Sequence, residues 1–151
     1  LGHSCHVRKR RADKKRIGWW EWVLLDGVTS EPVRAKIDTG AETSSLHAEK
    51  LSVIERDGEM IAKFRFKKRV CEAKVIELRS IKSSNGTSSL RPVVELAIAI
   101  AGETFMTQFS LADRSEMRFP VLLGRETLAG RFLVDAEDKQ VLGTLREVKR
   151  P

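Results

Sequence analysis

The chain has 151 residues, of which 41% are hydrophobic, and a formal net charge of +7 at pH 7. This length is typical of a single domain that can bury a real hydrophobic core. The longest apolar run, residues 96–101, is far shorter than the roughly 20 residues of a membrane-spanning helix, so no transmembrane segment is expected.

The positive charge is concentrated at the N-terminus. Residues 1–16 contain seven Lys or Arg and one acid, whereas the other 135 residues contain 21 bases and 20 acids. We therefore expect a basic, disordered tail at 1–16 and one folded domain at 17–151. The domain has no tyrosine and no alternation of aromatic and basic residues, so no specific nucleic-acid partner is expected.

The sequence leaves the localisation of the protein unknown. Because the chain starts at Leu1 rather than Met, we expect the native N-terminus to be missing, which leaves open the loss of a signal peptide or lipid-anchor region. The sequence favours a cytoplasmic protein and leaves an exported form open.

From residue 17 onward, the pattern predicts short strands separated by turns. The first, residues 19–26, ends at the turn pair Asp26-Gly27. Residues 32–38 follow, with alternating apolar and basic side chains. Residues 52–57 and 59–68 flank Asp57-Gly58, which is typical of a hairpin.

The second half of the chain continues this pattern. We expect a strand at 70–78, a polar loop at 80–89, and a hairpin of residues 93–101 and 104–111. A strand at 121–123, one helical turn at 125–129, and strands at 132–135 and 141–145 follow. No long helical period and no internal repeat occur, so the sequence predicts an all-β barrel or sandwich.

Two short motifs stand at the ends of predicted strands. Asp38-Thr39-Gly40 ends the strand at 32–38, and Leu122-Leu123-Gly124 is an apolar strand that ends in glycine. This pair resembles the retropepsin-like aspartic proteases. More widely, residues 17–145 resemble a bacterial family labelled "ATP-dependent zinc protease", which is associated with the ATP-grasp ligase that adds glutamates to a ribosomal protein. The segments that carry this resemblance are 18–23, 36–48, 90–94, 122–125 and 130–135.

The resemblance implies a retropepsin-like closed β-barrel with one short helix, working as an aspartic-type endopeptidase with Asp38 as its carboxylate. Thr39 would fix the loop by a hydrogen bond, and Gly40 would let its N–H approach the carboxylate. Leu122, Leu123 and Gly124 would form the dry floor beneath.

Hydrolysis by carboxylates needs two acids that share one proton. The chain has one Asp-Thr-Gly motif, so we expect a homodimer that pairs Asp38 with Asp38 of a second chain. Asp26, Asp57 and Asp135 are poorer partners because they lie at predicted turns or a strand end. The alternative is a noncatalytic peptide-binding module of the same fold, in which Asp38 only shapes its loop.

The association with a glutamate ligase implies a peptide or protein substrate with an acidic, glutamate-rich tail. Such a substrate requires bases near Asp38, although each base alone is also compatible with an ordinary solvated side chain. Arg125 is favoured because it follows Gly124. The candidate substrate-binding residues are Arg34, Lys36, Ala41, Arg79, Arg91, Arg125 and Arg131.

A retropepsin also needs a flap over the substrate. The hairpin around Asp57-Gly58 has the expected spacing from Asp38, and the loop at 80–89 has the composition of a mobile element, so both stay open.

Zinc and ATP are implied by the family label, and the sequence supports neither. His47-Ala48-Glu49 lacks the second histidine of a zinc-peptidase HExxH motif, and the glycine-flanked segment 124–131 lacks the Lys-Ser/Thr of a phosphate loop. We therefore expect no metal and no cofactor.

Overall fold

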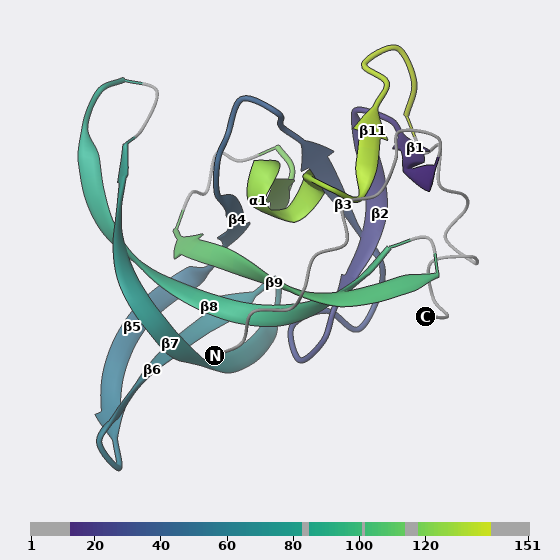
Figure 1. The fold of residues 1–151 in the computed structure, drawn as a ribbon. Helices are drawn as coiled ribbons and strands as arrows, with labels where there is room; N and C mark the ends of the chain where they lie inside the picture. Colours follow the sequence, from purple (N-terminus) through teal and green to yellow (C-terminus); the bar gives the residue numbers. More distant parts are fainter. Residues whose placement is uncertain (1–12, 83–84, 101, 114–117, 140–151) are drawn as a thin grey trace.

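The computed structural model describes residues 13–82, 85–100, 102–113 and 118–139. These residues form short and long strands and one short helix (Figure 1). The helix is α1 (Arg125–Leu128), and the strands are β1 (Lys15–Ile17), β2 (Trp20–Leu25), β3 (Val33–Ile37), β4 (Ser44–His47), β5 (Glu49–Arg56), β6 (Glu59–Phe66), β7 (Arg69–Lys82), β8 (Ser88–Ile100), β9 (Glu103–Ala112), β10 (Val121–Leu123) and β11 (Phe132–Val134).

Six strands close into a barrel. Their order is β2-β3-β10-β4-β9-β8, and pairing of Leu24 with Ala99 returns β8 to β2. The sheet continues beyond β8 through β7, β6 and β5, while β1 and β11 form a separate parallel pair. The predicted all-β closed barrel with one short helix is confirmed.

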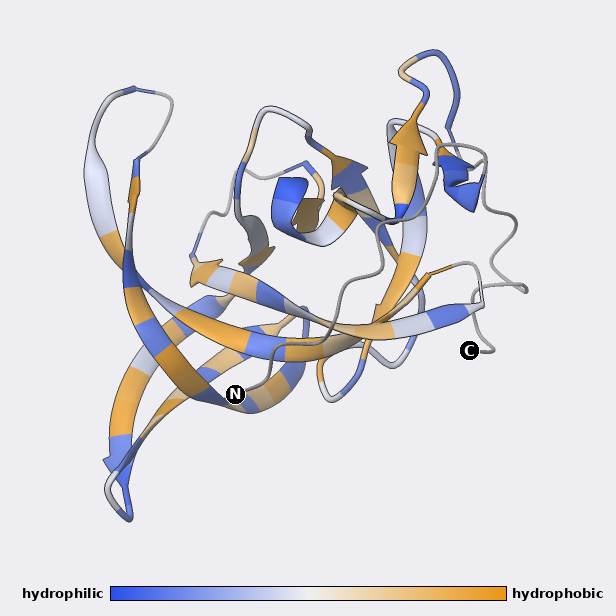
Figure 2. Ribbon diagram, in the orientation of Figure 1, coloured by the Kyte–Doolittle hydropathy of each residue, from blue (hydrophilic) through white to orange (hydrophobic). Residues whose placement is uncertain are grey.

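The barrel interior is filled by the alternating apolar residues of its strands. In β3, Val33, Ala35 and Ile37 are buried and the two bases between them are exposed, as predicted. The same alternation of hydrophobic and hydrophilic residues is visible along the long strands in Figure 2. Burial of these side chains is the main stabilising contribution to the barrel.

The hairpin predicted at Asp57-Gly58 is confirmed. Asp57 and Gly58 have φ values of 52° and 81°, the left-handed conformation that a two-residue hairpin turn requires. β5 and β6 pair on either side in antiparallel register, from Arg56 with Glu59 outward.

One barrel strand was not expected from the sequence. β4 contains two serines, which have little intrinsic preference for strands. It forms because both of its edges are paired, with β10 on one side and β9 on the other. Tertiary pairing therefore overrides the local sequence preference.

The polar loop predicted at 80–89 is shorter than expected, and the prediction was wrong at both of its ends. β7 runs to Lys82 and β8 begins at Ser88, with Ser80 opposite Leu90 and Ile81 opposite Ser89. Cross-strand backbone hydrogen bonding explains why such a polar sequence remains extended.

The N-terminal boundary also differs from the sequence-based expectation. Lys15 and Arg16, assigned to the basic tail, lie in β1 and pair with Phe132 and Leu133 of β11. Arg16 also bonds Asp135 Oδ2 at 2.7 Å. The strand predicted at 141–145 lies outside the described residues. Within the described part of the chain, no helix is long and apolar enough to cross a membrane.

Candidate active site

Asp38 lies where β3 ends, in a loop that we call the Asp38 loop (residues 38–43). Its backbone N–H donates to the Leu123 carbonyl at 2.9 Å, and its Oδ1 accepts the Gly40 N–H at 2.9 Å. The Ala41 N–H donates to the Asp38 carbonyl at 3.2 Å. The carboxylate is thus oriented by its own loop, as expected of Asp before a tight turn.

The glycine of the second motif lies directly against this loop. β3 and β10 are parallel, with Ile37 opposite Leu123, so Gly124 follows at the same end of the sheet. A Cβ on Gly124 would lie 2.8 Å from the Ala41 carbonyl oxygen and 2.9 Å from the Thr43 carbonyl oxygen. Only glycine therefore fits this position without a shift of the backbone.

The first turn of α1 completes the contact between the two motifs. The Arg125 N–H donates to the Ala41 carbonyl at 2.8 Å, and the Glu126 N–H donates to the Glu42 carbonyl at 3.0 Å. The Asp-Thr-Gly and Leu-Leu-Gly motifs, far apart in sequence, therefore form one hydrogen-bonded unit.

A buried group of hydroxyls supports this unit from inside. Ser44 Oγ accepts the Gly124 N–H at 3.0 Å and bonds Thr127 Oγ1, which lies 2.7 Å from Thr107 Oγ1. Sequence analysis did not identify these residues, because isolated Ser and Thr in a polar stretch carry no signal of burial. Fully paired buried hydroxyls fix the geometry around them.

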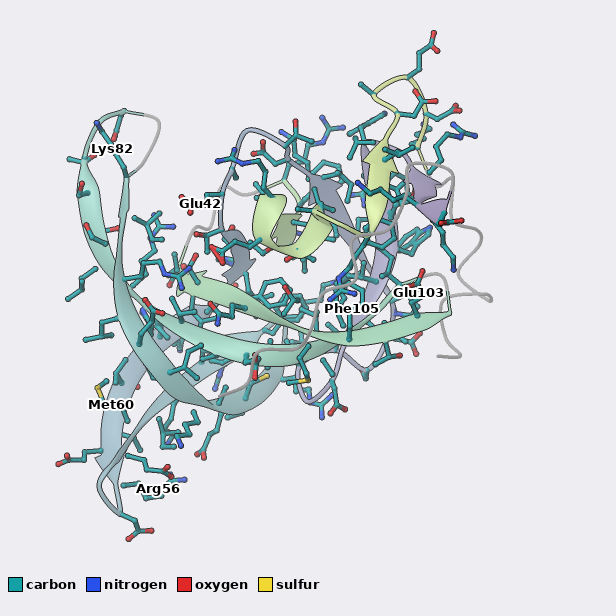
Figure 3. The ribbon with its side chains drawn as sticks, in the orientation of Figure 1. Glu42, Arg56, Met60, Lys82, Glu103 and Phe105 are labelled. Atoms are coloured by element: carbon teal, nitrogen blue, oxygen red, sulfur yellow. The ribbon has the colours of Figure 1, made fainter. Side chains whose placement is uncertain are left out.

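A cleft of about 1010 Å³ opens beside Asp38. Asp38, Gly40 and Ala41 of the predicted site line it, and so does Leu122 of the predicted floor, whereas Leu123 is fully buried. The β7–β8 hairpin supplies one wall; Figure 3 labels Lys82 near its end and Glu42 nearer to α1. The other lining residues are Lys36, Thr43, Ser45, Arg79, Ser80, Ile81, Arg91, Ser110 and Glu126.

The position of the cleft bears on the two flap candidates. Ser80, Ile81 and Lys82 of the hairpin line the cleft, and the turn at Asp57-Gly58 does not belong to the lining residues. The described residues 80–82 of the second candidate are therefore better placed than the Asp57-Gly58 turn to cover a substrate.

The predicted bases divide into two groups. Lys36, Arg79 and Arg91 line the cleft. Arg34 instead lies over the rings of Trp20 and Phe119, at 5.6 and 5.2 Å from their centroids.

The other two bases follow the Leu-Leu-Gly motif. Arg125 is exposed, and its Nη1 donates to the Thr39 carbonyl at 3.0 Å, so it contacts the Asp38 loop from outside the cleft lining. The Thr39 carbonyl, rather than its hydroxyl, makes this contact. Arg131 lies over the Phe105 ring at 3.8 Å.

Arg79 makes side-chain contacts with several elements around the cleft. Its guanidinium bonds both carboxylate oxygens of Glu77, at 3.1 and 3.0 Å, and Glu126 Oε1 at 3.2 Å. The hydrogen bonds to Glu77 raise the pKa of Arg79 above its ordinary value, and the charge of Glu126 adds to the effect. The same bonds lower the pKa of Glu77.

The cleft also contains two acids that sequence analysis did not propose, Glu42 and Glu126. His47 Nε2 lies 3.7 Å from Glu49 Oε2, and neither residue is among those that line the cleft. Among the described residues, no group of three or more His, Cys, Asp or Glu side chains is arranged to hold a metal ion.

Comparisons with known proteins agree with this geometry. Residues 16–144 match the family model for RimB-like proteins, described as retropepsin-like aspartic endopeptidase RimB. Lpg0085, a Legionella pneumophila protein of unknown function, has a similar structure: the TM-score is 0.71 and the identity 26%, over 85% of this chain and 98% of that one.

Curated relatives are longer proteins. A probable alpha-L-glutamate ligase of Shewanella pealeana is 35% identical over 135 residues, covering 84% of this chain and 30% of the relative. One from Desulfotalea psychrophila is 33% identical over 138 residues, covering 86% and 30%. The chain thus spans about 30% of the length of these relatives.

The predicted retropepsin-like fold is confirmed by the family match and by the paired Asp-Thr-Gly and Leu-Leu-Gly motifs. The chain belongs to the RimB-like family of retropepsin-like proteins.

Proposed function

We propose that the protein is an aspartic-type endopeptidase in which Asp38 is a catalytic carboxylate. The observation that carries this proposal is the position of Asp38: it lines a large cleft, and its loop is fixed from behind by Gly124 and α1. A preorganised carboxylate beside a substrate-sized cleft is what hydrolysis by this mechanism requires.

In the proposed reaction, an ionised carboxylate takes a proton from water as the water oxygen attacks the peptide carbonyl carbon. A second, protonated carboxyl gives its proton to the carbonyl oxygen. The tetrahedral intermediate then loses the C–N bond, and the amine leaves with a proton from the acid pair. Asp38 of a second copy would supply the second carboxyl, so the active form would be a homodimer.

The proposed substrate is a peptide rich in glutamate. Lys36, Lys82 and Arg91 bring positive charge to the cleft. The curated relatives are named as glutamate ligases, and a ligase of that kind makes glutamate-containing products. A product of such an enzyme is a consistent substrate for a cleft that presents these three bases beside Asp38.

Substitution of Asp38 by Asn tests the catalytic role, with Asp57→Asn as the matched control at a hairpin turn outside the cleft. We expect Asp38→Asn to lower the rate of oligoglutamate hydrolysis by roughly 10³-fold or more, with unchanged peptide binding. Asp57→Asn should retain wild-type turnover. Equal turnover of the two variants would contradict the catalytic role, and wild-type binding without hydrolysis would favour the noncatalytic peptide-binding module.

Light scattering over a concentration series tests the dimer. A dimer at the concentrations at which hydrolysis occurs is the expected result, and hydrolysis by a strict monomer would contradict the pairing of two Asp38 side chains. The independence of zinc and ATP expected from the sequence stays a prediction, for which the same assay with a chelator and without nucleotide is the test.

A further inference from the structure

The β7–β8 hairpin ends in an arm that is attached to the barrel by few backbone contacts. We use "arm" for residues 78–82 of β7 and 88–92 of β8, the teal hairpin at the left of Figure 1. β6 pairs with β7 only up to Lys74, and β9 pairs with β8 only from Val93 onward. Among the described strands, the arm therefore has no third strand beside it, and its two strands pair only with each other.

Arg79 connects this arm to the rest of the site. Besides Glu77, its guanidinium reaches Thr43 Oγ1 at 3.4 Å, Glu126 Oε1 at 3.2 Å and Gln108 Oε1 at 3.0 Å. These partners belong to the Asp38 loop, to α1 and to β9. We call this set of contacts the Arg79 network.

The side chain is well placed for a structural role. It is only 24% exposed, and its charge faces two carboxylates, Glu77 and Glu126. A planar guanidinium can donate in several fixed directions at once, which the ammonium group of lysine cannot do in the same way. Because two carboxylates already neutralise the charge of Arg79, this side chain attracts a substrate carboxylate only weakly.

We propose that Arg79 is a positioning residue, whose network holds the arm against the Asp38 loop and α1 and so sets the width of the cleft over Asp38. Its effect on Asp38 passes through Thr43, in the Asp38 loop, and through Glu126, whose N–H bonds the carbonyl of Glu42 in that loop. The kinetic consequence rests on the proposed peptidase function, whereas the structural consequence does not.

Amide hydrogen exchange measured by NMR tests the structural part. The reporters are the amides of Ala41, Arg125 and Glu126, which are bonded within the unit around Asp38, and those of the arm. We expect Arg79→Met to increase exchange roughly tenfold at both places, the effect of losing charge-assisted hydrogen bonds. Arg91→Met is the matched control, since Arg91 lies opposite Arg79 on the same arm.

The control should leave exchange at the amides of Ala41, Arg125 and Glu126 unchanged. Unchanged exchange in Arg79→Met, or an equal increase in Arg91→Met, would overturn the proposal. Glu126→Gln removes the negative charge of one partner, keeps an oxygen that can accept from Arg79, and leaves the bonds to Glu77 in place. It should therefore raise exchange at the reporters by a smaller factor. This milder variant decides the question if Arg79→Met fails to fold.

Kinetics separate positioning from direct attraction of the substrate. Arg79→Lys keeps the charge and loses the planar fork, so positioning predicts a lower kcat in both Arg79→Lys and Arg79→Met. If Arg79 instead binds substrate by its charge, lysine would restore KM and kcat, and the proposal would fail. Absence of hydrolysis by the wild-type protein would count against the peptidase function and leave the exchange test valid.

Discussion

The two sides of the cleft are built differently. The floor, formed by the Asp38 loop, β10 and α1, is held by backbone hydrogen bonds and by a glycine that admits no side chain. The arm opposite has exposed apolar residues, with Leu78 43% and Leu90 66% exposed, and reaches the floor through side chains. The difference indicates a rigid surface around Asp38 opposite an adjustable wall, as ligand entry to a covered cleft requires.

The largest expected effect is on the free energy of unfolding when one leucine on each side of the cleft is replaced by alanine. Leu123 is fully buried beneath the site, so Leu123→Ala should lower the free energy of unfolding by about 2–5 kcal/mol through lost burial and a cavity. Leu90→Ala in the arm should change it by less than about 0.5 kcal/mol. Urea denaturation measures both, and similar losses would contradict the contrast between floor and wall.

A second experiment addresses the close approach at Gly124. Gly124 has an ordinary φ of −97°, so alanine at this position causes no backbone strain. Gly124→Ala is expected to lower the free energy of unfolding by about 1–3 kcal/mol because its Cβ overlaps the Ala41 and Thr43 carbonyls. Gly58 has open space around it and a φ of 81°, so Gly58→Ala should cost about 1 kcal/mol from backbone strain alone.

Activity distinguishes these two glycine variants. Gly124→Ala should also lower turnover, since the shift falls on the Asp38 loop, while Gly58→Ala should retain it at a temperature where both are folded. Full activity in Gly124→Ala would show that the floor can move without consequence.

The smallest effect concerns the pH dependence of the arm. Because the Arg79 hydrogen bonds lower the pKa of Glu77, this carboxylate stays ionised and paired at neutral pH, and pairing is lost only as pH falls through that lowered pKa. NMR titration of the Glu77 carboxyl should therefore show a pKa below the ordinary value for Glu. In Arg79→Met the pKa should rise towards that value; an unchanged pKa would refute the pairing.

Much of the fold and the centre of the site were predictable from local sequence. The alternation in Val33, Ala35 and Ile37 indicated β3, and the two glycine-ended motifs identified the segments that meet at Asp38. These signals are short and depend on neighbouring residues, so a single sequence contains them.

The remaining features depend on contacts between distant residues. β4 is a strand because β9 and β10 lie on both of its sides, and no local propensity of Ser44 or Ser45 indicates this. The role of Arg79 follows from partners in other elements, whereas composition around it suggested only a base near a polar loop. Arg34 is the opposite case. The sequence suggested it as a substrate-binding base on the strand before Asp38, but its guanidinium packs on aromatic rings.

The contact between Arg125 and Thr39 joins residues that are 86 positions apart in the chain. A growing polypeptide therefore lacks the second half of the candidate site until β10 and α1 have emerged from the ribosome. Since long-range pairings form slowly in β proteins, we expect the Asp38 loop to acquire its final geometry late in folding. A nascent or truncated chain that stops before Gly124 would accordingly have the Asp-Thr-Gly motif without the contacts that fix its loop.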